Sequence, residues 1–121
     1  YYMQHLMGMF DSLVACKFGM FGGLTVNPLI RALNAVTGWD FDRDKFFRTG
    51  ERIFNIKRLY NVRLGISRKD DVIPVRMLNQ RRGGTNELPP LNVLLDEYYK
   101  LRGWNEFGIP TDDKLKELSL A

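Results

Sequence analysis

Apolar residues recur every three or four positions through most of this chain, which is the spacing of one face of an α-helix. The first such series predicts a helix over residues 1–17 and comprises Tyr2, Leu6, Met9 and Leu13. The longest predicts a helix with Asp42 as its N-cap that ends near Arg63. Its expected core face comprises Phe46, Gly50, Ile53, Ile56 and Tyr60. No stretch alternates between apolar and polar residues over the length of a strand, so the pattern predicts an all-α fold.

Capping residues delimit two shorter helices. Asn27 followed by Pro28 predicts a helix start, with the asparagine as N-cap and the proline at the first helical position. Gly38 follows the last apolar residue of this helix and predicts its C-terminal cap. Near the end of the chain, Thr111 predicts the N-cap of a last helix, because the two acidic residues after it suit the positive end of a helix.

A further helix is expected after an internal loop. Residues 79–91 include a Gly-Gly pair and a Pro-Pro pair, which predict the loop. Asn92 then predicts the N-cap of a helix that Gly103 ends. The expected core side of this helix comprises Leu94, Leu95, Tyr98 and Leu101. The chain is thus expected to form a single irregular helical domain of four to six helices over residues 1–121.

Positive charge is concentrated in the central third of the chain, and the net charge is +4. This permits one alternative function, a basic helical module that binds nucleic acid or another partner without catalysis. A solvated helix face accounts for the same charge more simply. Aromatic residues are not interleaved with the basic ones as in proteins that bind single strands, so nucleic-acid binding is not expected.

Length and composition are those of an ordinary folded domain: 121 residues, 45% of them hydrophobic. No apolar run approaches the ~20 residues of a membrane span, and the first ten residues lack the features of a signal peptide. The single cysteine excludes an internal disulfide, which favours a reducing cytoplasm. The chain begins without methionine and inside an apolar pattern, which suggests a fragment of a longer protein.

Cys16 is the only cysteine, and Asp11 precedes it by five residues. A zinc ion or an iron–sulfur cluster normally takes four ligands, so one thiol cannot hold either. Three interpretations are open: an inert buried residue, a lone reactive thiol, or the last ligand of a site whose other ligands lie elsewhere. The only histidine, His5, lies beside apolar residues and is interpreted as structural. No catalytic residue is predicted from the sequence.

Three segments, in order, resemble the tungsten-containing aldehyde:ferredoxin oxidoreductase family, and together they extend over essentially the whole chain. They are residues 32–40 (ALNAVTGWD), residues 50–63 (GERIFNIKRLYNVR) continuing into 67–71 (SRKDD), and residues 95–104 (LDEYYKLRGW) with 108–111 (GIPT). The resemblance implies the C-terminal helical domain of a much longer enzyme.

The family has a pterin-binding motif, Asp-x-x-Gly-Leu-Cys, which corresponds here to Asp11, Val14, Ala15 and Cys16. The resemblance implies that Asp11 contacts a pterin and that Cys16 is the fourth ligand of a [4Fe–4S] cluster. Lys17 would attract the negative cluster and cofactor by charge, or else point to solvent. Val14 and Ala15 depart from the usual Gly-Leu. That departure suggests one alternative, a family member whose site has decayed.

In the resembled enzymes, an aldehyde is oxidised to a carboxylic acid at tungsten, or molybdenum, held by two pterins, and electrons pass through the cluster to ferredoxin. The expected partners are therefore ferredoxin, an aldehyde substrate and the N-terminal catalytic domains of the same chain. The isolated 121-residue chain is expected to be inactive and without cofactor. An exposed patch near its start predicts self-association into a homo-oligomer, and this patch comprises Met7, Met9, Phe10, Met20 and Phe21.

Overall fold

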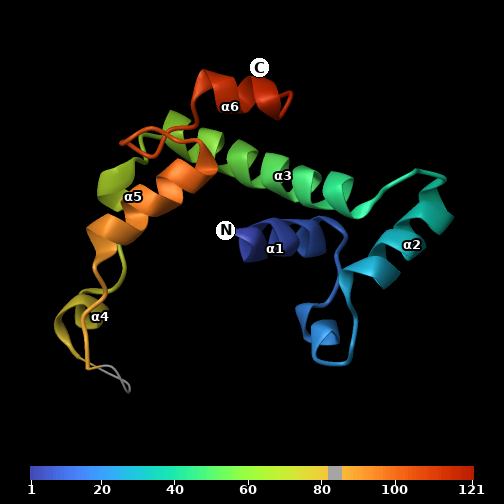
Figure 1. Cartoon of the computed structure of the whole chain (residues 1–121), viewed down its shortest axis with the longest axis horizontal. Helices are drawn as coiled ribbons and strands as arrows, with labels where there is room; N and C mark the ends of the chain where they lie inside the picture. Colours follow the sequence, from blue (N-terminus) through green and yellow to red (C-terminus); the bar gives the residue numbers. More distant parts are fainter. Residues whose placement is uncertain (82–85) are drawn as a thin grey trace. The chain divides into compact units, whose positions relative to one another are not determined.

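The computed structural model describes residues 1–81 and 86–121, and within these ranges it confirms the all-α prediction. The described residues form six α-helices, two short 3-10 helices and no strand. In chain order (Figure 1) the elements are α1 (Tyr2–Ser12), η1 (Lys17–Met20), α2 (Val26–Thr37), α3 (Arg43–Arg63), η2 (Arg68–Asp70), α4 (Val75–Asn79), α5 (Leu91–Arg102) and α6 (Asp112–Glu117). Residues 82–85 of the predicted loop 79–91 lie outside the described residues.

The elements group into two compact units. Unit 1 contains residues 1–57 and Leu120, and unit 2 contains residues 58–119 and Ala121. The division falls inside the long helix α3. The sequence predicts a single domain, and this stays a prediction.

Two of the predicted N-caps are confirmed by side-chain hydrogen bonds. The Asp42 carboxylate accepts from the backbone N–H of Lys45 at 2.7 Å, at the start of α3. The Thr111 hydroxyl accepts from the backbone N–H of Lys114 at 3.3 Å, at the start of α6. Both satisfy a donor that the first helical turn leaves without an intrahelical partner. The two predicted glycine C-caps have left-handed φ angles, 72° at Gly38 and 66° at Gly103.

Two other predicted helix starts are wrong. Helix α2 begins one residue before Asn27, so Pro28 is its third residue rather than its first. Helix α5 begins one residue before Asn92. In neither helix does a side chain cap the first turn. Proline is tolerated anywhere in the first turn, because the N–H that it lacks has no acceptor there. The Asn-Pro pair therefore marks the region of the start but not its residue.

The core of unit 1 lies where α1 meets α2 and α3. It comprises Leu6, Met9, Phe10, Ile30 and Phe46. Two of the residues predicted to form an exposed patch, Met9 and Phe10, are only 3% and 1% exposed, so that prediction is wrong for them. Both side chains belong to the core cluster, which also contains residues of α2 and α3. Phe21 is exposed, as predicted.

The core of unit 2 differs from the predicted one. Leu94 and Leu101 of α5 were expected to face inward, but both are exposed, and the buried residues of this helix are Tyr99 and Arg102. Polar side chains tolerate burial here because they find hydrogen-bond partners. The Nε of Arg102, for example, donates to the Tyr98 hydroxyl at 2.9 Å. In α3, Ile56 and Tyr60 were also expected in the core and are likewise exposed.

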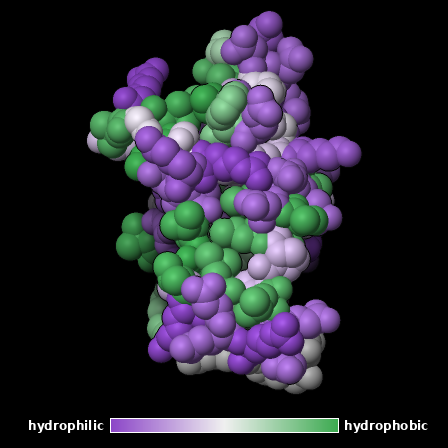
Figure 2. Space-filling model, turned by 90° about the vertical axis from the view of Figure 1, so that its left-hand side faces the viewer, coloured by the Kyte–Doolittle hydropathy of each residue, from purple (hydrophilic) through white to green (hydrophobic). Residues whose placement is uncertain are grey.

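Many large hydrophobic side chains remain on the surface of both units. They include Val14, Phe18 and Phe21 in unit 1, and Val93, Leu94 and Leu101 in unit 2. Figure 2 shows hydrophobic residues between hydrophilic ones on the face that it draws. Within residues 1–81 and 86–121, no helix combines the length and the apolar character needed to cross a membrane.

Candidate functional site

Helix α1 ends five residues earlier than predicted, and its end places the predicted site residues. The predicted helix over residues 1–17 is corrected to Tyr2–Ser12. The N–H of Ala15 donates to the carbonyl of Phe10 at 2.9 Å, and the N–H of Val14 donates to the carbonyl of Asp11 at 3.2 Å. This pair of bonds is a Schellman motif, the common way of ending a helix. Asp11 consequently lies on the last turn of α1, and Cys16 lies beyond the helix.

Val14 occupies the left-handed position of this motif, with a φ of 53°. That conformation normally requires glycine, and a β-branched residue in it is strained. The resembled family has glycine at this place in its motif. Val14 therefore ends helix α1 at a position that glycine would occupy without strain.

Replacing Val14 by glycine is expected to stabilise the chain by about 1 kcal/mol, because left-handed φ costs a non-glycine residue roughly 1–3 kcal/mol and the greater freedom of unfolded glycine offsets part of this. The measurement is urea unfolding followed by circular dichroism. Val36, an exposed valine inside α2, supplies the matched control. Val36→Gly should destabilise by a few tenths of a kcal/mol, from helix propensity alone. Destabilisation by Val14→Gly would contradict the assignment of strain.

Cys16 is exposed, with its backbone extended at the start of η1. Its carbonyl accepts a hydrogen bond from the N–H of Gly19 at 3.0 Å, which closes the first turn of η1. The exposed thiol excludes the interpretation of Cys16 as an inert buried residue. The exposed position suits both a lone reactive thiol and a ligand of a shared site.

Asp11 and Lys17 form an ion pair across the turn, with 3.1 Å between Lys17 Nζ and Asp11 Oδ1. Both side chains are about half exposed, so the pair contributes no more than about 1 kcal/mol to stability. A weak exposed pair of this kind can rearrange when another group binds. The structure thus brings Asp11 and Lys17, two of the three predicted site residues, into direct contact. The third, Cys16, is the residue before Lys17 in the sequence.

The described residues contain no group of three or more histidine, cysteine or acidic side chains arranged to hold a metal ion. A single cysteine can supply at most one ligand to a four-ligand iron–sulfur site, so the role of Cys16 as a ligand stays a prediction. His5 is buried and packs against the Tyr1 ring at 4.4 Å between centroids, which agrees with its structural interpretation.

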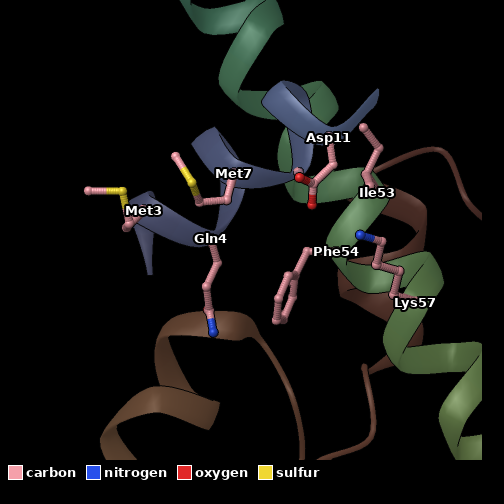
Figure 3. A pocket seen from close by; sticks show the side chains of 8 residues that line it. Met3, Gln4, Met7, Asp11, Ile53, Phe54 and Lys57 are labelled. Atoms are coloured by element: carbon pink, nitrogen blue, oxygen red, sulfur yellow. The ribbon is translucent and has the colours of Figure 1, made fainter. Parts of the chain in front are cut away.

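Asp11 also lines a pocket between α1 and the unit 1 part of α3 (Figure 3). The pocket has a volume of about 170 Å³, below the roughly 300–1,000 Å³ of a typical small-molecule site. It can hold one flat ring system or a side chain but not a large cofactor. Its lining comprises Met3, Gln4, Met7, Gly8, Asp11, Ile53, Phe54 and Lys57.

Sequence reasoning missed this pocket, although a signal was present. Met3 and Met7 are four residues apart, as are Ile53 and Lys57, so each pair shares a face of its helix. What the sequence did not contain was the contact between the two helices. Only that contact brings Lys57 to the same pocket as Asp11.

A second polar cluster, in unit 2, serves the fold. Buried Arg58 donates to both carboxylate oxygens of Asp71 at 2.8 and 2.6 Å, and to the carbonyl of Gly108 at 2.7 Å. The Tyr99 hydroxyl also donates to Asp71. Burial alone would raise the pKa of Asp71, but the hydrogen bonds from Arg58 and Tyr99 outweigh it and lower the pKa below 3.8. Burial and the bond to Asp71 raise the pKa of Tyr99 to about 12.

Two of the central basic residues are thus used inside unit 2. Arg58 pairs with Asp71, and Arg68 pairs with Asp96 at 2.5 Å. Arginines held by carboxylates of their own chain are less available to phosphates. This does not favour the alternative of a basic nucleic-acid-binding module.

Comparison with known proteins covers nearly the whole chain. Residues 1–120 match the family model described as aldehyde ferredoxin oxidoreductase, domains 2 & 3. The tungsten-containing aldehyde ferredoxin oxidoreductase of Pyrococcus horikoshii is 40% identical over 121 residues, which are 97% of this chain and 20% of that protein. That of Thermococcus kodakarensis is 38% identical over 122 residues, 98% of this chain and 20% of that protein.

The chain therefore spans about a fifth of the length of these relatives. The all-α structure agrees with the match. By this evidence the chain belongs to the aldehyde ferredoxin oxidoreductase family.

Proposed function

We propose that this chain is the C-terminal part of a tungsten- or molybdenum-pterin enzyme that oxidises aldehydes to carboxylic acids and passes the electrons to ferredoxin. The observation that carries the proposal is an exposed cysteine, Cys16, placed five residues after Asp11 in a chain that belongs to this family. The relatives are named tungsten-containing aldehyde ferredoxin oxidoreductases, which supports tungsten as the metal, an aldehyde as the substrate and ferredoxin as the electron acceptor.

Cys16 fits the role of an iron ligand. A [4Fe–4S] cluster is held by four cysteine thiolates, and a ligand cysteine must present its sulfur outward to a cluster whose other ligands come from elsewhere. The exposed thiol at the start of η1 meets that requirement. On ligation the thiol gives up its proton.

Asp11 fits the role of a pterin acceptor. Its Oδ1 is paired with Lys17, and its Oδ2 has no hydrogen bond or ion pair within residues 1–81 and 86–121. An ionised carboxylate accepts hydrogen bonds from the amino and ring N–H groups of a pterin more strongly than a neutral group would. Lys17 adds positive charge beside the carboxylate.

When bound, the metal pterin and the cluster would supply the oxidation and electron-transfer chemistry. This chain's residues bind and orient: Cys16 holds one iron, Asp11 holds the pterin edge, and Lys17 orients Asp11. We assign no catalytic residue within the chain. A cytoplasmic location, ferredoxin as partner, and homo-oligomer formation are parts of the same proposal.

The first test is the metal content of the full-length protein, purified without oxygen. We expect about four irons and one tungsten or molybdenum per chain. Iron without either metal would reduce the proposal to an electron-transfer relative, and no metal at all would refute it.

Replacing Cys16 by serine in that protein is expected to remove most of the iron, because serine is a poor substitute for a thiolate ligand. Iron content and the visible absorption of the cluster report the result. Ser12→Ala is the matched control, since the Ser12 hydroxyl only donates to the carbonyl of Gly8 in its own helix. The control should keep about four irons. If Cys16→Ser keeps them too, Cys16 is not a ligand.

A further inference from the structure

We infer that Lys57, on helix α3, is a second contact to the pterin ring that Asp11 binds, so that the pocket between α1 and α3 forms one edge of the cofactor site. This inference rests on the proposed function, because it assigns a further residue to the same site. Its starting point is that a carboxylate and an ammonium group line one small pocket.

The two charged groups share the pocket without pairing with each other. Asp11 pairs with Lys17 through Oδ1, and no ion pair among the described residues joins Asp11 to Lys57 or engages Lys57 at all. In Figure 3 both side chains point into the pocket. Opposite charges that line one pocket and remain apart can contact a ligand that has donors on one side and acceptors on the other.

A pterin ring has this character. Its amino and ring N–H groups are donors that suit the Asp11 carboxylate, and its ring carbonyl is an acceptor that suits the Lys57 ammonium. The rest of the pocket is apolar, with the Phe54 ring and the thioethers of Met3 and Met7, which suit the flat faces of a heterocycle. The volume of about 170 Å³ admits one ring system and not the whole cofactor.

The two residues that recognise the ring come from different helices. Asp11 is on the last turn of α1, whose position is fixed by the Schellman motif after it. Lys57 is on α3, which packs closely against α1 because both helices have glycine where they meet. The side of the ring that each residue contacts is therefore set by rigid elements rather than by loops.

The test uses the full-length protein purified without oxygen, with Lys57 replaced by methionine to keep the aliphatic stem and remove the charge. During dialysis, released pterin is measured by fluorescence after oxidation, and tungsten, molybdenum and iron are measured in the retained protein. We expect Lys57→Met to lose pterin and tungsten or molybdenum about tenfold faster than the wild type, but to keep its iron. A tenfold change corresponds to the loss of one hydrogen bond to a charged group. Lys57→Arg should restore most of the retention.

Two controls separate this inference from its alternatives. Lys45→Met removes a lysine from the same helix outside the pocket, where it contacts Asp40, and should leave retention unchanged. Asp11→Asn should speed pterin loss if the proposed function holds. Faster loss with Asp11→Asn but not with Lys57→Met would overturn the inference alone. A wild-type protein without pterin would overturn both the inference and the proposed function. If Lys57→Met loses iron and thermal stability along with pterin, Lys57 has a structural role and the inference is wrong.

Discussion

Replacing Asp71 by asparagine is expected to lower the free energy of unfolding by about 3 kcal/mol. Asparagine keeps the shape of the side chain but leaves the buried Arg58 guanidinium without a counter-charge, and removing one partner of a buried pair costs roughly 3–5 kcal/mol. We take the lower end because Asp71 itself is 24% exposed. Urea unfolding followed by the fluorescence of Trp104, which is buried against Arg58, measures the loss in unit 2.

The pH dependence identifies the cause of that loss. The pKa of Asp71 is lower in the folded chain than its ordinary 3.8, so the folded state favours the ionised form. The stability from this group is present above pH 3.8 and is lost as the pH falls through the folded pKa. The pKa of Tyr99 is raised from 10.0 to about 12, so its contribution is lost as the pH rises from 10 to 12. Asp71→Asn should abolish the loss on the acid side that this carboxyl contributes.

Asp96 provides the matched control in the same unit. It also pairs with an arginine, Arg68, but its side chain is 67% exposed. Asp96→Asn should therefore change the free energy of unfolding by less than about 1 kcal/mol. Equal losses from Asp71→Asn and Asp96→Asn would show that burial of the Arg58 pair does not matter for stability.

Replacing Gly50 by alanine is expected to destabilise unit 1 by about 2–3 kcal/mol. A Cβ on Gly50 would lie 2.3 Å from the backbone carbonyl oxygen of His5, so helix α1 or α3 would have to shift. Overpacking of this kind costs about 1–3 kcal/mol, and more where backbone must move. The clash outweighs the roughly 1 kcal/mol by which alanine favours a helix over glycine. Urea unfolding of the variant by circular dichroism measures the difference.

Gly8, on the facing helix, provides the control with the opposite sign. A Cβ there would lie 3.5 Å from the carbonyl of Gly50 and from the side chain of Ile53, which is ordinary contact. The helix propensity of alanine should then dominate, and Gly8→Ala should be neutral or stabilising by up to about 1 kcal/mol. Destabilisation of both variants by the same amount would mean that the two helices do not approach as closely as described.

The candidate site shows how far the residues alone could lead. The Asp11–Cys16 spacing and its family resemblance could be recognised from the sequence, because they depend on residues close together in the chain. The exposure of Cys16 and the ion pair of Asp11 with Lys17 were not, because they depend on where α1 ends. Val14 is the reason that the end of α1 was not predicted. Glycine at this position would have predicted a helix end, whereas valine predicts a continuing helix.

The sequence by itself determined the all-α class, the two confirmed N-caps, the glycine C-caps and the family, because each depends on local periodicity, on capping chemistry or on ordered motifs. Only the tertiary structure decided which faces are buried. Tyr99, Arg102 and Arg58 are inside unit 2, while Leu94 and Leu101 are outside, since polar side chains become favourable in a core once partners from distant segments satisfy them. The hydropathy pattern contains no information on contacts between distant segments. It therefore could not predict such partners, or that Lys57 lines the same pocket as Asp11.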